Sequence, residues 1–144
     1  MYPGVVIYPE AVIGDDFTAH ARAVVRERVR IGNRVVLGVG SVIGGEGFGY
    51  IPLPGGGVQR VRQIGTVELG DDVEVGANTT IDRAAIGATR VEQGAKLDNL
   101  VMIAHGCRIG PEVLIAAQTG LAGSTTIEAR AQLCLLYTSD AADE

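Results

Sequence analysis

The chain has 144 residues and a formal net charge of −5, which argues against nucleic-acid binding because such proteins usually present a basic face. Hydrophobic residues make up 47% of the sequence but aromatic residues only 4%, with 21 Gly and no Trp, so we expect a core of small aliphatic side chains. No signal peptide and no apolar run of about 18 residues is present. The two cysteines, Cys107 and Cys134, have neither disulfide nor metal-ligand spacing. We expect a cytoplasmic protein with no transmembrane segment, metal or bound cofactor.

An aliphatic residue recurs every six positions along most of the chain, with two breaks in the series. At one of these positions, Ala19, the residue is alanine. Gly or Ala often follows it, and a small or β-branched residue often stands two positions before it. Two registers that coincide in this way indicate an internal repeat. The series consists of Ile7, Ile13, Ala19, Val25, Ile31, Leu37, Ile43, then Leu69, Val75, Ile81, then Val91, Leu97, Ile103, Ile109, Ile115, Leu121 and Ile127.

A period of six fits neither an α-helix, at 3.6 residues per turn, nor a two-faced strand. It is typical of a parallel β-helix with a triangular cross-section, in which three hexads close one coil of 18 residues. We therefore predict an all-β fold whose repeated aliphatics point inward and stack on the residue 18 positions away. The alternative is a β-sandwich with accidental spacing. Resemblance to known hexapeptide-repeat proteins implies a left-handed coil, against the usual right-handed preference.

The first break in the register, residues 45–63, contains six Gly and two Pro and is predicted to be a loop that leaves the coil. Loops of this length are usually functional or disordered. Phe48 and Tyr50, two of the six aromatics of the chain, lie in it. Either the segment lines a ligand site or grips a neighbouring subunit, or it is a surface loop whose rings pack on the coil.

The second break, Asp82 to Arg90, shifts the register by four residues and is predicted to be a short bulge at a corner. Arg83 stands beside Asp82 in this bulge, and we interpret the two as a solvated ion pair.

Both ends of the chain look truncated, because the repeat is already in phase at Ile7 without a preceding cap. Residues 1–132 are assigned to the β-helix domain. The segment Leu133–Glu144 resembles translated sequencing-adapter read-through and is expected to be a non-native tail. The alternative is a genuine C-terminal tail.

His105 is the strongest candidate for a catalytic residue. It stands two positions after the inward Ile103, at a predicted corner that faces out of the prism. Asn99 has the same offset one hexad earlier and follows Asp98, and a carboxylate near an imidazole can fix its tautomer and raise its basicity. Gly123 follows His105 by 18 residues, so it should stack one coil further on, where its backbone N–H could face an oxyanion.

The other candidates have simpler interpretations. His20 follows Ala19 at a corner and is expected to be a polar surface residue, and Cys107 has an inward offset that predicts inert packing. On sequence pattern alone, an ordinary surface role for His105 also stays open. The chain has no serine-nucleophile motif and no phosphate-binding glycine loop.

Three segments resemble a specific family: GGEGFGY (44–50), VRQIGTVELGDDVEVGANTTIDRAA (61–85) and KLDNLVMIAHGCRIG (96–110). They are similar to the UDP-3-O-acylglucosamine N-acyltransferases of lipid A biosynthesis, and the resemblance runs from about Val5 to Gln132. The related O-acyltransferase of the same pathway has a comparable His motif but lacks the GFGY segment and this TTIDR context.

The resemblance implies a left-handed β-helix that forms a homotrimer, with active sites in clefts between neighbouring helices. It implies a 3-hydroxyacyl donor on the phosphopantetheine of acyl carrier protein and a UDP-linked 3-O-acylglucosamine acceptor with a free 2-amine. His105 matches the catalytic base, and Gly123 matches the backbone donor to the oxyanion. Asp98 and Asn99 match flanking residues with orienting and substrate-contact roles, and Phe48 and Tyr50 are expected to contact substrate.

The chain also departs from the family pattern. Gly106 stands where the family commonly has Asn, which predicts a looser corner. The N-terminal uridine-binding domain, the later coils, a second functional His and the C-terminal helical extension of the family are absent from the 144 residues. Two other functions stay open: a non-catalytic hexapeptide scaffold, and a sugar acetyltransferase that uses acetyl-CoA.

Overall fold

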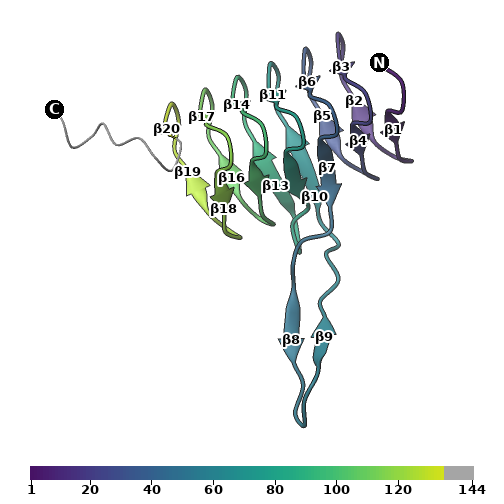
Figure 1. Cartoon of the computed structure of the whole chain (residues 1–144), viewed down its shortest axis with the longest axis vertical. Coiled ribbons are helices and arrows are strands. Elements are labelled where there is room, and N and C mark those ends of the chain that lie inside the picture. The colour runs from purple at the N-terminus through teal and green to yellow at the C-terminus, as the bar shows by residue number, and fades with distance from the viewer. Residues whose placement is uncertain (135–144) are drawn as a thin grey trace, which may run out of the picture.

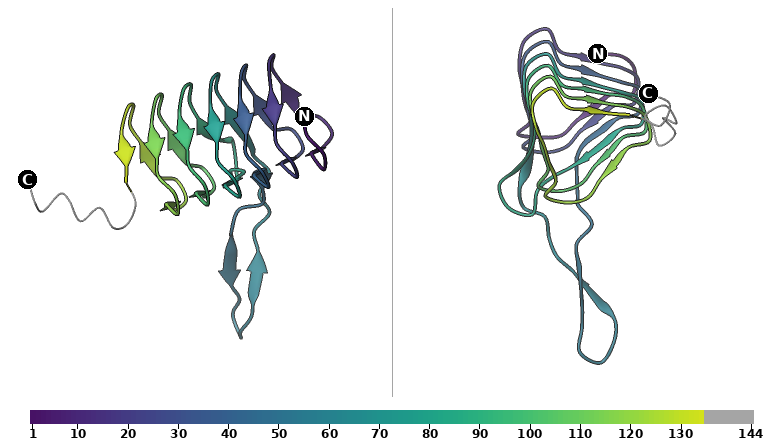
Figure 2. Two further views of the ribbon diagram at one scale, coloured as in Figure 1. Left: turned by 45° about the horizontal axis from the view of Figure 1, so that its top comes forward. Right: turned by 90° about the vertical axis from the view of Figure 1, so that its left-hand side faces the viewer.

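The computed structural model describes residues 1–134 and consists of short β-strands that wind into a left-handed parallel β-helix. Viewed along its axis, the coil has a triangular outline, and one long hairpin projects from a corner (Figures 1 and 2). Three six-stranded parallel sheets form the sides of the prism. The predicted all-β solenoid is therefore confirmed. Along residues 1–134 there is no helix long and apolar enough to cross a membrane.

Each coil contributes one strand to each of the three sides, which we call sheets A, B and C. Sheet A contains β1 (Val6–Ile7), β4 (Val24–Val25), β7 (Val42–Gly45), β12 (Thr80–Asp82), β15 (Met102–Ile103) and β18 (Gly120–Leu121). Sheet B contains β2 (Val12–Ile13), β5 (Arg30–Ile31), β10 (Thr66–Leu69), β13 (Ala88–Val91), β16 (Arg108–Ile109) and β19 (Thr126–Ile127). Sheet C contains β3 (Thr18–Ala19), β6 (Val36–Leu37), β11 (Glu74–Val75), β14 (Lys96–Leu97), β17 (Leu114–Ile115) and β20 (Gln132–Leu133).

The pairing register matches the 18-residue coil predicted from the sequence. Val25 pairs with Ile43, 18 residues on, and Ile103 pairs with Leu121 at the same offset. The two breaks lengthen individual coils without disturbing the stack, since Ile43 pairs with Ile81 across the first and Ile81 with Ile103 across the second. The repeat thus survives in space even where it is interrupted along the chain.

The core is a column of aliphatic side chains along the axis of the prism. Leu37, Ile43, Ile81, Ile103 and Ile109 are fully buried, and the residues two positions before the repeat, such as Val35 and Val101, point inward as well. Burial of a side chain of this size stabilises the fold by roughly 1.5–3 kcal/mol. Both sequence registers therefore serve one core, which explains the scarcity of aromatic rings.

The corners turn by means of one residue in the left-handed conformation, which recurs every six positions. Glycine occupies this place at Gly4, Gly40, Gly94 and Gly106, with φ between 67° and 77°. Other residue types hold the same conformation elsewhere: Glu10, Asp16, Arg22, Arg28, Arg34, Asp72, Asn78, Leu100, Glu112, Gln118, Ser124 and Arg130. Gly106 adopts the same turn as the other corners, and the looser corner expected there stays a prediction.

The first break is more ordered than the predicted loop. Residues 45–65 leave the corner between sheets A and B and form an antiparallel hairpin of β8 (Tyr50–Pro52) and β9 (Val58–Arg60), which hangs away from the prism in Figure 1. Glu46 and Arg60 form an ion pair at its base. We call residues 45–65 the excursion.

The C-terminal boundary of the coil lies beyond the predicted one. Leu133, one residue past the predicted end of the β-helix domain, pairs with Ile115 in β20. Cys134 follows as an exposed residue. The rest of the predicted non-native tail, residues 135–144, lies outside the described residues.

We predict that Leu100→Asn raises the free energy of unfolding by about 0.5–1 kcal/mol. Leu100 has φ 58° and is 52% exposed, and the left-handed conformation costs an ordinary L-residue about 1–2 kcal/mol, whereas Asn tolerates it. Chemical denaturation measures the change. Leu114→Asn is the matched control: Leu114 is an exposed residue of β17, where Asn is disfavoured, so stability should fall. A loss of stability in both variants would contradict the prediction.

Candidate active site

The corner between sheets A and B, here called the A–B corner, contains His105 and several other candidate site residues. His105 lies in the turn that follows β15, and Gly123 lies in the turn of the next coil, after β18. Asp82 and Arg83 occupy the preceding coil, where β12 ends, and the excursion leaves the same corner one coil earlier. Asp82 and Gly123 are 41 positions apart in sequence, and the axial stacking of coils brings them to the same corner.

His105 and Gly123 are neighbours across successive coils, as the 18-residue spacing predicts. The His105 carbonyl accepts a hydrogen bond from Ser124 N at 2.9 Å. The imidazole lies over Gly123, where a Cβ would be only 2.5 Å from Cε1 and 2.6 Å from Nε2. Any other residue at position 123 would displace the ring, so glycine here sets the position of the imidazole.

The excursion covers the other side of His105. A Cβ on Gly47 would lie 2.9 Å from Cβ of His105 and 3.3 Å from its Cδ2. His105 is therefore half-buried at its corner, and glycine is required at position 47 as well. Gln63, where the excursion returns, is buried beside the same glycine. The sequence pattern contains no signal for Gln63, because it lies in neither inward register.

Arg83 is buried, and the predicted solvated ion pair with Asp82 is wrong. Its side chain is 3% exposed, its Nε donates to Gly44 O at 2.8 Å, and its backbone N donates to Gly45 O at 2.8 Å. Nη2 lies 3.0 Å from Oε1 of Glu27. Arg83 therefore holds the point where the excursion leaves the coil, two residues before the glycine that covers His105.

Glu27 completes a charged cluster at this corner. Arg26 donates to both of its carboxylate oxygens, at 2.8 and 3.1 Å, and lies over the ring of Tyr8. Burial acts to raise the pKa of Glu27, but the hydrogen bonds from Arg26 and the charge of Arg83 outweigh it and lower the pKa to about 2. Glu27 is thus an anion that neutralises the buried guanidinium.

Asp82 is the carboxylate that shares a corner with His105. It is half-buried, and desolvation raises its pKa to about 6, while a positive charge on His105 acts in the opposite direction. A carboxylate close to an imidazole stabilises the protonated ring. The sequence pattern assigned no function to Asp82, since it falls inside a register break.

Asp98 and Asn99 lie at a different corner, between sheets C and A, and are exposed. Asp98 accepts hydrogen bonds from the backbone N of Asn99 and of Ala117, and Asn99 accepts one from Ala77 N. The expected contact between Asp98 and His105 is therefore not formed within one chain. The two residues lie at opposite ends of the strand β15, at successive corners of the coil.

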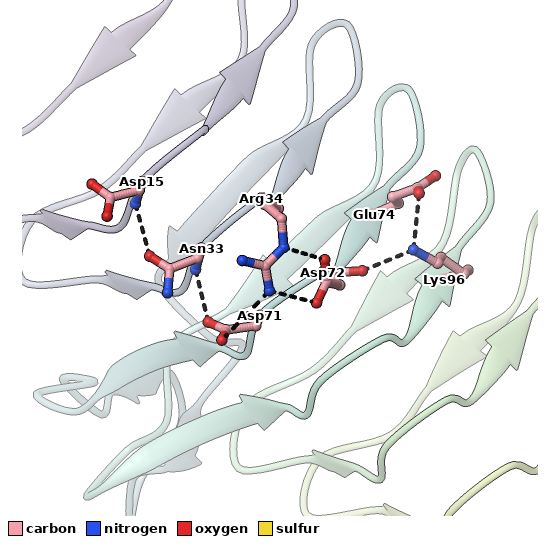
Figure 3. Close-up of polar contacts among 7 residues, drawn as sticks. All are labelled: Asp15, Asn33, Arg34, Asp71, Asp72, Glu74 and Lys96. Atoms are coloured by element: carbon pink, nitrogen blue, oxygen red, sulfur yellow. Dashed lines mark hydrogen bonds and ion pairs between the residues drawn. The ribbon is translucent and has the colours of Figure 1, made fainter.

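The same use of Asp and Asn is seen at the corner between sheets B and C. Asn33 accepts a hydrogen bond from Asp15 N, and Asp71 accepts one from Asn33 N, both at 2.8 Å (Figure 3). Arg34 and Lys96 continue this line along the axis through Asp72. Short polar side chains thus satisfy corner N–H groups that no strand pairs, which gives Asp98 and Asn99 a structural role besides any chemical one.

The aromatic pair of the excursion remains in solvent. Phe48 is 81% and Tyr50 45% exposed, and their rings pack against each other with centroids 5.0 Å apart. The two rings therefore do not pack on the coil, which was one of the two interpretations of this segment. Cys107, by contrast, is buried as predicted, and its Sγ donates to Ala122 O at 3.1 Å.

The hollows of the surface lie on the faces of the prism. One of about 710 Å³ is lined by Arg30, Glu68, Arg90 and Glu92 on sheet B, and one of about 380 Å³ by Arg28, Ile64 and Ile86 beside the base of the hairpin. Neither includes His105. In residues 1–134 the excursion instead fills the space beside the imidazole.

Comparison with known proteins agrees with this architecture. The model of the family "Bacterial transferase hexapeptide (six repeats)" matches residues 10–45. A UDP-3-O-acylglucosamine N-acyltransferase of Anaeromyxobacter dehalogenans is 48% identical over 132 residues, covering 88% of this chain and 37% of the relative. A protein of the same name from Chlorobium chlorochromatii is 59% identical over 92 residues, covering 64% and 26%.

The resemblance drawn from the sequence motifs is confirmed. The chain spans 37% and 26% of the lengths of these two relatives. Among solved structures, the UDP-N-acetylglucosamine acyltransferase of Arabidopsis matches with a TM-score of 0.61 at 17% identity, over 90% of this chain and 57% of that one. The corresponding protein of Campylobacter jejuni matches with a TM-score of 0.56 at 20% identity, over 92% and 62%. At these identities the structural matches establish the fold alone.

We predict that Arg83→Met lowers the free energy of unfolding by about 1–3 kcal/mol, because Gly44 O loses its buried donor. Native-state proteolysis of the hairpin should accelerate in parallel, since the excursion loses its attachment. Arg90→Met is the control, because Arg90 forms an exposed pair with Glu68 and such pairs contribute about 1 kcal/mol or less. Equal effects of the two substitutions would refute the anchoring role.

A second prediction concerns the pH dependence of stability. The pKa of Asp82 is raised from 3.8 to about 6 in the folded chain, so its contribution to stability is complete below pH 4 and is lost as the pH rises through 6. Asp82→Asn should remove this loss and stabilise the chain at pH 7.5 relative to wild type, as chemical denaturation at several pH values would measure.

Asp72→Asn is the control of opposite sign. The hydrogen bond from Arg34 lowers the pKa of Asp72, so this group favours folding at neutral pH and loses its contribution as the pH falls. Identical pH profiles for wild type and Asp82→Asn would contradict the assignment of Asp82.

Proposed function

We propose that the chain forms the catalytic β-helix of an N-acyltransferase. The donor is a 3-hydroxyacyl thioester on the phosphopantetheine of acyl carrier protein, and the acceptor is the 2-amine of UDP-3-O-acylglucosamine. The observation that carries the proposal is the position of the His105 imidazole over Gly123 of the next coil. The names of the relatives, which are 46–59% identical to this chain, support the reaction class.

The proposed reaction assigns a role to each of these two residues. The amine nitrogen attacks the thioester carbonyl carbon, and His105 takes a proton from the nitrogen as general base. The carbonyl oxygen becomes an oxyanion, which the backbone N–H of Gly123 stabilises. The C–S bond then breaks, and the imidazolium returns its proton to the thiolate. An amide and a free thiol are the products.

Gly123 suits the oxyanion role because of its place in the corner. Some equivalent N–H groups at other corners are paired by side chains of the following coil, as Asp15 N is by Asn33 and Ala77 N by Asn99. In the part of the chain that the structure describes, Gly123 N has no such acceptor, and position 141, one coil further on, lies outside it. A corner N–H that strand pairing does not use can donate to a ligand, and we assign this role to Gly123 N.

Asp82 supports the base through its charge. When His105 takes a proton, the nearby carboxylate stabilises the imidazolium, and a pKa of about 6 for Asp82 makes this support effective at neutral pH and above. Activity should therefore rise as the pH passes 6, beyond any change that His105 itself causes.

Asp98 and Asn99 fit this scheme as residues of a neighbouring subunit. They occupy the same coil as His105 but an adjacent corner. In a homotrimer whose three prisms run parallel to the symmetry axis, the height along the axis is preserved, so one corner of a subunit can face another corner of the next. The cleft between subunits would then contain His105 from one chain and Asp98 and Asn99 from another.

The decisive test replaces the matching residues of the Anaeromyxobacter dehalogenans relative with those of this chain, and follows acylation of the UDP-sugar. The chimera should be active with acyl carrier protein thioesters, and His105→Ala should lower kcat by roughly 10²–10⁴-fold. His20→Ala is the control, since His20 stacks on Tyr2 at another corner.

Three results would overturn the proposal. Near-normal activity of His105→Ala would exclude the base. An inactive chimera that still folds would favour a non-catalytic scaffold. Preference for an acetyl-CoA donor would indicate a sugar acetyltransferase.

A further inference from the structure

Gln63 is a buried side chain with one polar atom left unpaired. It is 5% exposed, at the point where the excursion returns to the coil. Its Nε2 donates to Val61 O at 3.2 Å, whereas Oε1 has no hydrogen-bond partner among the described residues. A buried acceptor without a donor is destabilising, so a ligand that donates a hydrogen bond to this atom would remove the penalty.

The orientation of the amide is set by its neighbour. A carbonyl accepts but cannot donate, so Val61 O requires the NH₂ group of Gln63 on its side. The oxygen is therefore the atom that faces Gly47. A flipped amide would place two acceptors against each other and leave the donor unpaired.

The free oxygen and the proposed base border the same small space. A Cβ on Gly47 would be 3.1 Å from Oε1 of Gln63 and 3.3 Å from Cδ2 of His105. Only the hydrogens of Gly47 separate the two groups. Gly45 and Gly49 flank Gly47. A ligand atom reaches both groups only if this glycine-rich segment shifts, which the conformational freedom of glycine permits.

We propose that Oε1 of Gln63 accepts a hydrogen bond from the N–H that the acceptor amine retains while His105 removes another proton from the same nitrogen. The inference rests on the proposed function and adds a selectivity to it. An amine nitrogen offers one N–H to the base and a second to Gln63, whereas a hydroxyl has a single hydrogen, which the base must take. Gln63 thus favours amine over hydroxyl acceptors, since a site built for a hydrogen bond discriminates against ligands that lack it.

The experiment measures the binding of two acceptors to the chimera by calorimetry, without donor: UDP-3-O-acylglucosamine and its analogue with a hydroxyl in place of the 2-amine. Gln63→Met keeps the length of the side chain and removes the acceptor. It should weaken binding of the amine by about 10- to 100-fold and leave the hydroxyl analogue almost unchanged, so the ratio of the two Kd values collapses. In the acylation assay, kcat/KM for the amine should fall by a similar factor.

Gln59→Met is the matched control, because Gln59 is an exposed glutamine of β9 in the same hairpin. Equal weakening of both acceptors by Gln63→Met would mean that Gln63 only supports the excursion, and an unchanged amine Kd would mean that it makes no contact. Either result overturns the inference while leaving the proposed function intact. The proposed function fails on a different result, the retention of activity in His105→Ala.

Discussion

Axial stacking of identical positions is the constraint on which the rest of this molecule depends. Each inward aliphatic must lie on the equivalent residue of the next coil, because parallel strands pair along the axis only in that register and the core is only as wide as one triangle of side chains. A chain held in this way can vary its outward residues freely. It can also insert extra residues, provided that they leave and return at a corner.

Corners are therefore the places where this fold can build a site. The sides of the prism are strands of two to four residues with little room for shaped surfaces, and their outward side chains form ion-pair ladders such as Arg90–Glu68 and Lys96–Glu74. At a corner, by contrast, the backbone N–H groups are not used by strand pairing, and side chains of successive coils meet. The A–B corner has this property and also carries the excursion, so polar side chains from several coils meet there.

Glycine shapes that edge from both sides. Gly123 and Gly47 let the imidazole of His105 lie against backbone, where any Cβ would collide with it. Two buried polar side chains then secure the arrangement: Arg83 holds the departure of the excursion, and Gln63 lies at its return. The charge of Arg83 is tolerated because Glu27, itself paired with Arg26, stands beside it. The site is thus held mainly by backbone contacts and a few enclosed polar groups.

The sequence by itself determined the solenoid, its 18-residue coil and the juxtaposition of His105 with Gly123, because within an unbroken repeat sequence distance translates directly into distance along the axis. It also identified both interruptions. Only the tertiary structure decided what the interruptions do: that residues 45–65 form a hairpin whose base covers His105, that Arg83 is buried, and that Asp82 and Gln63, not Asp98 of the same chain, are near the imidazole. Across a break of twenty or four residues the repeat no longer measures distance, and burial of a polar side chain depends on neighbours that no local pattern encodes.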